Sequence, residues 1–299
     1  MFKQVSIIGC GLIGSSVFRA LKKNNFAKEV ITFDNNKSVS EVIKKENLSD
    51  KIVSSPEEAV SDADLVLIST PLSTFESAVN SIKKYLKPES ILTDTSSVKK
   101  GADAIVKKMN LKNIFWIPSH PVAGTEKSGP RAGSPDLFKD RWTILTPDSK
   151  IKDSEVKKVS LFWESMGSKV KIMSAVDHDK ILSLTSHLPH VVAYNIVKTA
   201  MGDDEKTKQD IIRYSAGGLR DFTRIAASNP TMWKDIFIDN SDLIIRAIEN
   251  FIKNLTEFKI AIKEKDSKKL LDIFEKSKEF REEIIKAGQD TDKPDFGRK

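Results

Sequence analysis

A glycine-rich turn near the start of the chain most strongly limits how it can fold. The apolar run at residues 5–8 leads into a Gly-Cys-Gly-Leu-Ile-Gly motif at residues 9–14, and a helical pattern follows. A strand that passes through G-x-G-x-x-G into a helix is typical of a dinucleotide-binding βα unit. Gly9 allows the tight turn, Gly11 lets the backbone approach a pyrophosphate, and Gly14 lets the helix pack on the strand. The pyrophosphate is then expected at the helix N-terminus, against unpaired N–H groups.

An acidic residue supports the same interpretation. Asp34 closes the second strand-like run, about twenty residues after Gly14, where this fold places the acid that binds a ribose 2′-hydroxyl. A carboxylate repels a 2′-phosphate, so NAD is expected rather than NADP, although Lys37 is close enough in sequence to meet such a phosphate. A glycine turn that serves packing alone is the alternative. The residues expected to bind the cofactor are Gly9, Gly11, Leu12, Ile13, Gly14, Asp34, Ser69, Thr70 and Pro71.

Strand-like and helix-like segments alternate through the first half of the chain, whereas only helical periodicity follows from residue 175 to residue 287. The alternation predicts an α/β fold, with a Rossmann-type doubly wound parallel sheet covered by helices on both faces. We expect a dinucleotide-binding domain over residues 1–173 and an all-helical substrate and dimerisation domain over residues 174–299. Beyond the first strand, the strand patterns lie at residues 29–34, 63–70, 90–94, 113–117, 141–146 and 169–173.

Composition narrows the class of protein. The 299 residues are 39% hydrophobic and 30% charged, which suits a soluble globular protein of two domains. No run of apolar residues is long enough for a transmembrane helix, and no secretory leader is evident, so no membrane association is expected. The single Cys10 excludes an intramolecular disulfide and fits a reducing cytoplasm. The net charge of +7 comes from lysines scattered among acidic residues, which indicates a solvated surface and no nucleic-acid partner.

Polar residues follow several of the predicted strands. In open parallel sheets, ligands bind beyond the carboxyl ends of the strands. There the chain places residues 69–71, residues 94–97 and residues 119–121. His120 and Ser97 are therefore expected to face the nicotinamide half of the site. A histidine at that point suits alcohol oxidation, because it accepts the hydroxyl proton while hydride leaves the same carbon. A polar residue that caps a loop is the alternative for His120.

Three of the four histidines fall within one short stretch, as His178, His187 and His190. His187 and His190 are three residues apart, so they share a face if the segment is helical. A metal site is disfavoured, because no cysteine cluster or third ligand stands at zinc spacing. Polar residues at a domain interface, or residues that position substrate or cofactor, both fit the pattern.

A pair of glycines precedes two arginines further along the chain. Gly217 and Gly218 interrupt the helical pattern, and Arg220 and Arg224 follow. A guanidinium delivered into a cleft in this way would bind a carboxylate with two parallel hydrogen bonds. Two surface arginines on a helix are the alternative.

With these pieces in place, the chain resembles the prephenate/arogenate dehydrogenase family of tyrosine biosynthesis. The resemblance covers most of the chain and rests on four segments. They are DTSSVK at 94–99 for the family's D-x-x-S-V-K, HPVAGTEKSG at 120–129 for H-P-x-A-G-x-E-x-S-G, SHLPH at 186–190 for S-H-L-P-H, and GGLRDFTRIA at 217–226 for G-G-x-x-D-x-T-R-I-A.

The resemblance implies an NAD-dependent oxidative decarboxylation of a cyclohexadiene, either prephenate or arogenate, in which the ring becomes aromatic. By this similarity His120 accepts the proton of the ring hydroxyl, Ser97 binds the same hydroxyl, and Arg224 holds a substrate carboxylate. The remaining pocket residues implied by the resemblance are His178, His187, His190, Thr125 and Glu126. No residue plainly reads the keto or amino group that distinguishes the two substrates.

The family also implies a homodimer formed through the helical domain. The apolar face along residues 243–255 must be buried against some partner, either within the domain or across such an interface. Two other functions stay open. One is a β-hydroxyacid dehydrogenase, which pairs the same cofactor fold with a helical domain; such enzymes resemble one another in using a lysine base on a helix of the second domain, whereas the signal here is a histidine at a strand end. The other is a dinucleotide-sensing protein, which would need no catalytic residues.

Overall fold

The computed structural model describes residues 2–201 and 204–288. The chain divides into two compact units, residues 1–244 and residues 245–299. The predicted boundary at residue 174 coincides with a helix start, because Ser174 caps a helix that begins at Ala175. The compact unit nevertheless continues to residue 244, so the division at 173/174 stays a prediction about domains.

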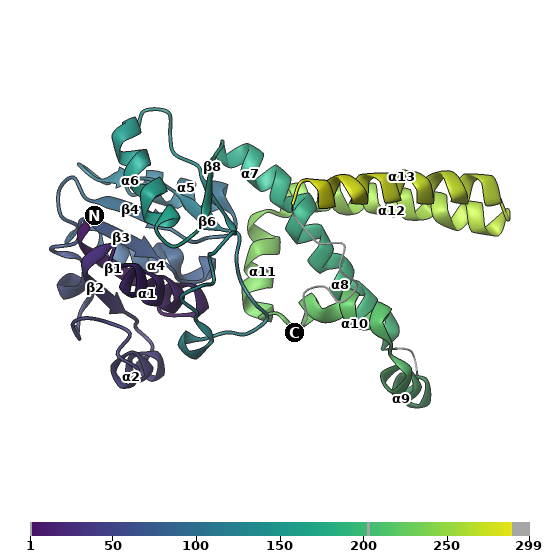
Figure 1. Cartoon of the computed structure of the whole chain (residues 1–299), viewed down its shortest axis with the longest axis horizontal. Helices are drawn as coiled ribbons and strands as arrows, with labels where there is room; N and C mark the ends of the chain where they lie inside the picture. Colours follow the sequence, from purple (N-terminus) through teal and green to yellow (C-terminus); the bar gives the residue numbers. More distant parts are fainter. Residues whose placement is uncertain (1, 202–203, 289–299) are drawn as a thin grey trace. The chain divides into compact units, whose positions relative to one another are not determined.

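The first unit is built on a parallel sheet (Figure 1). Its five strands are ordered β2-β1-β3-β4-β5, and every neighbouring pair is parallel. The strands are β1 (Phe2–Ile8), β2 (Ala27–Phe33), β3 (Leu65–Ile68), β4 (Ile91–Asp94) and β5 (Phe115–Trp116). The helices between them are α1 (Leu12–Asn24), α2 (Lys37–Lys45), α3 (Pro56–Val60), α4 (Leu72–Ile82) and α5 (Lys99–Lys108).

Helices bury both faces of this sheet. Alternate strand residues enter two separate apolar cores, so that Ile7 belongs to one core and Ile8 to the other. The first core contains residues of α1 and α6 (Asp153–Glu164), and the second contains residues of α3, α4 and α5. This arrangement confirms the predicted doubly wound Rossmann-type fold.

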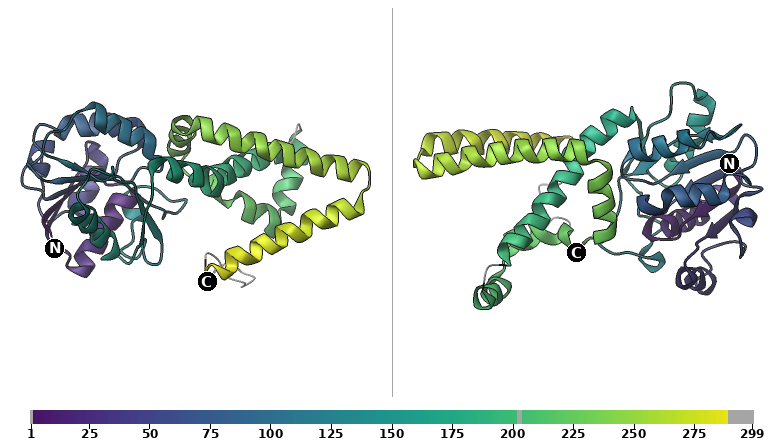
Figure 2. Two further views of the ribbon diagram at one scale, coloured as in Figure 1. Left: turned by 90° about the horizontal axis from the view of Figure 1, so that it is seen from above. Right: turned by 180° about the vertical axis from the view of Figure 1, so that it is seen from behind.

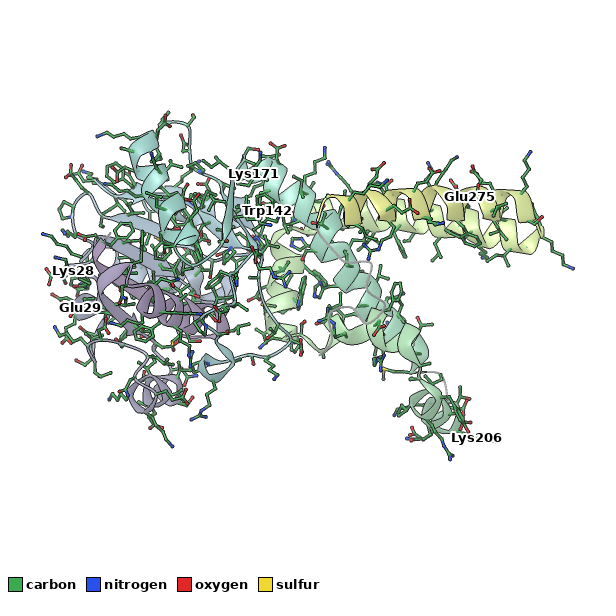
Figure 3. The ribbon with its side chains drawn as sticks, in the orientation of Figure 1. Lys28, Glu29, Trp142, Lys171, Lys206 and Glu275 are labelled. Atoms are coloured by element: carbon green, nitrogen blue, oxygen red, sulfur yellow. The ribbon has the colours of Figure 1, made fainter. Side chains whose placement is uncertain are left out.

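A second, smaller sheet receives the last predicted strands. It consists of β6 (Ser119–Pro121), β7 (Trp142–Leu145) and β8 (Lys169–Ile172), with β6 antiparallel to β7 and β7 parallel to β8. Figure 3 labels Trp142 of β7 and Lys171 of β8, which come from neighbouring strands. The segment that begins with β5 stops pairing with β4 at Pro118, because proline has no N–H to donate. The Pro118 carbonyl oxygen accepts a hydrogen bond from the Thr146 N–H of the second sheet instead. The sequence pattern found β7 and β8 but not the change of sheet, and it placed residues 119–121 beyond the end of a parallel strand rather than in a strand of their own.

Helices make up the rest of the first unit, as predicted. Within the described residues no strand follows β8. The helices are α7 (Ala175–Leu182), a π-helical turn (Ser183–His187), α8 (Leu188–Ala200), α9 (Glu205–Tyr214), α10 (Gly217–Thr223), a 3-10 turn (Arg224–Ala227) and α11 (Pro230–Asp239). The break between α9 and α10 falls at Ser215 and Ala216, and the glycine pair, expected to interrupt a helix, forms the first two residues of α10.

The second unit contains most of α12 (Ser241–Lys263) and α13 (Ser267–Lys286). The rings of Phe258 and Phe274 lie 6.0 Å apart near the turn that joins the two helices. The left view of Figure 2 shows the helices diverging away from that turn, and α13 buries none of its residues. Among the described residues, none of the helices has the length and apolar character needed to span a bilayer.

Candidate active site

The glycine turn after β1 has the geometry that its sequence predicts. Gly9 has a φ of +97°, and a Cβ there would lie 2.6 Å from the Ser69 carbonyl oxygen at the end of β3. A Cβ at Gly14 would collide with the Gly9 carbonyl oxygen. A Cβ at Gly11 would meet no described heavy atom within 4 Å. Gly9 and Gly14 are therefore required by packing, whereas Gly11 leaves open space beside the N-terminus of α1.

Asp34 also has a structural role, which the sequence pattern did not reveal. Its carboxylate accepts hydrogen bonds from the backbone N–H of Cys10, at 2.8 Å, and of Asn36, at 2.9 Å. The acid therefore orders the glycine turn itself. Cys10 is fully buried beside it, and burial raises the pKa of its thiol to about 12. The thiol is neutral, which agrees with the packing interpretation of Cys10.

The other predicted cofactor residues lie around the same turn. Thr70 is next to Gly9 and its hydroxyl is buried with no partner among the described residues. The Ser69 hydroxyl accepts a long hydrogen bond from Thr95, at 3.3 Å. Leu12 and Ile13 are half-buried in the first turn of α1, which no described side chain caps. The backbone N–H groups at this helix end are thus available for an anion.

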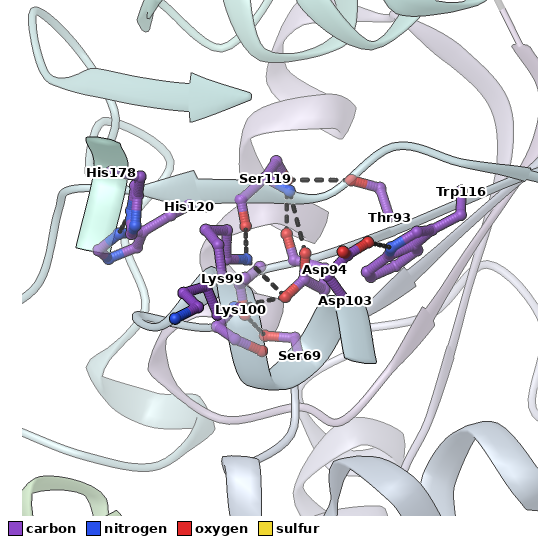
Figure 4. Close-up of polar contacts among 12 residues, drawn as sticks. Ser69, Thr93, Asp94, Lys99, Lys100, Asp103, Trp116, Ser119, His120 and His178 are labelled. Atoms are coloured by element: carbon purple, nitrogen blue, oxygen red, sulfur yellow. Dashed lines mark hydrogen bonds and ion pairs between the residues drawn. The ribbon is translucent and has the colours of Figure 1, made fainter. Parts of the chain in front are cut away.

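A buried ion pair fixes β6 beside β4 (Figure 4). Lys99 is completely buried, and its Nζ donates to Asp94 Oδ2 and to the Ser119 carbonyl oxygen, both at 2.6 Å. Asp94 Oδ1 accepts in turn from the Ser119 N–H at 3.0 Å. Burial lowers the pKa of Lys99, and the neighbouring Asp94 offsets only part of that shift. These bonds set the position of His120, the next residue along β6.

His120 lies in a buried chain of three residues. Its Nδ1 is 2.8 Å from His178 Nε2, and His178 Nδ1 is 2.7 Å from Asp179 Oδ1. Figure 4 shows the rings of His120 and His178 next to each other. Burial, with smaller contributions from His178, Lys99 and His187, lowers the pKa of His120 well below 6.5. His120 is therefore a neutral imidazole at physiological pH, the form that a base requires.

His187 and His190 share a face, as predicted. Both rings contact the indole of Trp233. The ring centres of His190 and Trp233 lie 3.4 Å apart in a stacked arrangement, and those of His187 and Trp233 lie 6.2 Å apart in an edge-on arrangement. His187 Nδ1 lies 3.1 Å from Asn240 Nδ2, and His190 Nδ1 lies 2.9 Å from the Ser186 carbonyl oxygen. Burial lowers the pKa of His187 to about 4. Among the described residues, no group of three or more His, Cys, Asp or Glu side chains is arranged to hold a metal ion, here or elsewhere.

Arg224 and Glu126 come together from distant parts of the chain. Arg224 Nη1 lies 3.8 Å from Glu126 Oε2, and both side chains are largely exposed. Burial is the main cause of the lowered pKa of His190, and the positive charge of Arg224 lowers it further, so the guanidinium lies near that ring. The Thr125 hydroxyl accepts from the Lys127 N–H at 3.2 Å within the same loop. The half-buried Ser97 lies in the turn between β4 and α5.

Several buried residues of this region were not predicted as site residues. Asp179, Asn240 and Trp233 support the histidines, and Lys99 supports β6. Asp179 and Lys99 stand inside segments that the sequence pattern had singled out, and Asp179 directly follows His178, so an acid next to a predicted site histidine was a usable signal. Asn240 and Trp233 carried none, because only the folding of α11 brings them to the histidines.

Two family models together match most of the chain. Residues 17–172 match the prephenate dehydrogenase nucleotide-binding domain, and residues 174–276 match the prephenate dehydrogenase dimerization domain. Over 283 residues, the chain is 39% identical to cyclohexadienyl dehydrogenase of Zymomonas mobilis. This alignment covers 94% of this chain and 96% of that protein. It is also 29% identical to prephenate dehydrogenase of Bacillus subtilis, over 94% of this chain and 76% of that protein.

A solved structure gives the same result. Prephenate dehydrogenase from Aquifex aeolicus, in complex with hydroxyphenyl propionate and NAD+, superposes with a TM-score of 0.87 at 32% identity. The match covers 95% of this chain and 99% of that one. Two successive family domains, a relative of nearly equal length and a shared fold lead to one conclusion: the chain belongs to the prephenate dehydrogenase family.

Proposed function

We propose that the protein is an NAD-dependent dehydrogenase that oxidatively decarboxylates prephenate, arogenate or both in tyrosine biosynthesis. The observation that carries this proposal is the buried, neutral His120, which Lys99 and Asp94 hold beside the sheet edge that bears the glycine turn. Membership of the prephenate dehydrogenase family supports the choice of substrate. We also propose that the protein acts in the cytoplasm, because its one cysteine, Cys10, is a free thiol and fits a reducing compartment.

The residues around the glycine turn fit NAD. Gly11 leaves space for a pyrophosphate, and the uncapped first turn of α1 offers it N–H donors. Asp34 retains lone pairs for a ribose hydroxyl after accepting its two backbone bonds, and its charge disfavours a 2′-phosphate. NAD, when bound, supplies the acceptor for a hydride.

His120 acts as a general base that first accepts and later returns one proton. Its Nδ1 is engaged by His178, so Nε2 is the atom that accepts the proton of the ring hydroxyl. The carbon that bears this hydroxyl loses a hydride, and the ring carboxylate leaves as carbon dioxide with its bonding electrons left in the ring. The product is a phenol, so the reaction releases no net proton, and His120 returns its proton to the phenolic oxygen. Aromatisation drives the step, and the protein supplies mainly orientation.

Initial rates with prephenate and with arogenate, each with NAD and with NADP, test the proposal. We expect turnover with NAD and at least one of the two substrates. Tight NAD binding without turnover of either substrate would favour a dinucleotide-sensing protein instead.

Arg224→Ala is expected to raise the KM of the substrate by about tenfold to a hundredfold, with a smaller change in kcat. A hydrogen-bonded ion pair between a guanidinium and a carboxylate contributes about 1.5–3 kcal/mol, and a contact made equally in ground and transition states affects KM alone. Steady-state kinetics measures both constants. Arg213→Ala is the matched control, because Arg213 lies on α9 with its guanidinium carbon 5.7 Å from the centre of the Tyr214 ring. A KM that stays at the wild-type value would contradict the role of Arg224.

We also propose that the protein is a homodimer through its helical region. Large apolar side chains of the second unit are exposed, among them Ile252, Leu255 and Phe274, and α13 buries none of its residues. The dimerization-domain match over residues 174–276 supports a second copy as the partner. Light scattering is expected to give twice the chain mass of 33.4 kDa. Leu255→Glu is expected to shift the protein toward monomer, whereas Lys253→Glu on the same helix should not. A wild-type monomer at micromolar concentration would contradict the proposal.

A further inference from the structure

Asp179 occupies an unusual position for a buried carboxylate. It belongs to α7, but it accepts hydrogen bonds from the Lys99 N–H at 2.8 Å and the Lys100 N–H at 3.0 Å. These are the first two residues of α5, and Val98 at the start of that helix provides no side-chain cap. Asp179 therefore caps α5 from another element, where the helix dipole also favours a negative charge. Its remaining bond goes to His178 Nδ1.

The groups around Asp179 keep it ionised. Burial raises the pKa of this carboxyl, but the hydrogen bonds from His178, Lys99 and Lys100 outweigh burial and leave the pKa below 3.8. The ammonium of Lys99 does not compete for Asp179, because its Nζ binds Asp94 and the Ser119 carbonyl oxygen. A carboxylate can only accept, so the ring nitrogen that faces it, His178 Nδ1, must carry a proton.

This proton determines the next one along the chain. Burial lowers the pKa of His178, and Asp179 offsets that shift only in part, so the ring is neutral at physiological pH. With the proton of His178 on Nδ1, its Nε2 holds a lone pair and must accept. The facing atom, His120 Nδ1 at 2.8 Å, is then the donor. A neutral His120 that donates from Nδ1 has its lone pair on Nε2.

We infer that Asp179, acting through His178, is a positioning residue that holds neutral His120 in the Nδ1–H tautomer and so presents an unprotonated Nε2 to the substrate hydroxyl. The inference rests on the proposed function, in which His120 is the base. Once Nε2 has taken the proton, the same chain stabilises the imidazolium, because its Nδ1–H still donates toward His178 and the Asp179 charge lies behind it. The other charged or titratable groups packed nearby are Lys99, Asp94, His187 and Asp239.

The wild-type protein offers a direct test by nuclear magnetic resonance of its imidazole nitrogens. The chain has only four histidines, so their ring signals can be assigned by single substitutions. At neutral pH, with or without NAD, His120 is expected to show a protonated Nδ1 and an unprotonated Nε2, and His178 the same pattern. A His120 ring protonated on Nε2 would overturn the inference. This measurement needs no turnover, so an inactive protein with the expected tautomer would refute the proposed reaction and leave the proton assignment intact.

A substitution tests the catalytic consequence. Asp179→Asn keeps the size of the side chain but removes its charge, and we expect kcat to fall at least ~10²-fold, while the KM of the substrate and the Kd of NAD change little. Asp177→Asn is the matched control on the same helix, where Asp177 is exposed and bonded to Ser174. A merely structural cap would lower the melting temperature but leave the tautomer and the kcat of the folded protein unchanged, and that result would reject the positioning role. If the variant does not fold, the tautomer of the wild-type ring decides.

Discussion

Replacement of His120 by Asn is expected to lower kcat at least ~10²-fold while the protein still binds NAD, because general base catalysis contributes roughly 10²–10⁴-fold. Asparagine is polar and of similar size, but it cannot accept a proton at neutral pH. The site supports His120 from two sides, through the His178 ring and through the bonds of Ser119 to Lys99 and Asp94. The substitution therefore removes the base and leaves the frame that carries it.

The pH dependence of the wild-type enzyme belongs to the same prediction. Burial is the main cause of the low pKa of His120, followed by His178, Lys99 and His187. A base whose pKa lies well below 6.5 is unprotonated through the neutral range, so kcat/KM is expected to be level there. It should fall only as the pH drops toward that low pKa and the ring becomes protonated.

Kinetics over pH 5 to 8 and a fluorescence titration with NAD check both parts. An Asn variant that keeps the wild-type kcat would contradict the role of His120 as the base. Loss of NAD affinity along with kcat would instead mean that the substitution disturbed the sheet edge, and the melting temperature of the variant then identifies the damage.

The glycine turn could be predicted from sequence because it is a local signal. Gly9, Gly11 and Gly14 depend on conformation and clearance within one turn, which a spacing rule captures. The pairing of β6 with β7 could not be predicted in that way, since it depends on where Pro118 ends the pairing with β4 and on strands far apart in the chain. The sequence located β7 without indicating its partners, and it did not mark residues 119–121 as a strand.

The network behind the base shows the same limit. Asp179 meets the first turn of α5 about eighty positions earlier in the chain, and Asn240 meets His187 only because α11 ends beside the π-helical turn. The sequence pattern placed the histidines on one face but assigned no partner to their nitrogens. Proton positions depend on those partners, so the tautomer of the base became accessible only from three-dimensional contacts.

Lys99→Met is expected to lower the free energy of unfolding by ~3–5 kcal/mol, the usual effect of removing one partner of a buried ion pair. Methionine fills similar volume, so the loss comes from the charge and its hydrogen bonds rather than from a cavity. Lys99 and Asp94 are completely buried, and Lys99 Nζ also satisfies the Ser119 carbonyl oxygen. The substitution leaves a buried carboxylate without its counter-ion and a buried carbonyl with one donor fewer.

Urea unfolding at neutral pH measures this loss, and α5 provides a matched control. Lys107 pairs with Asp103 at 2.7 Å on the same helix, but its side chain is 55% exposed, so Lys107→Met is expected to change the free energy of unfolding by at most ~1 kcal/mol. Adding Asp94→Asn to Lys99→Met should recover part of the loss, because it removes the unpaired charge while its amide oxygen can still accept from Ser119. If Lys99→Met costs no more than the control, the buried pair does not hold β6 in place, and the position of His120 must depend on the His178 contact alone.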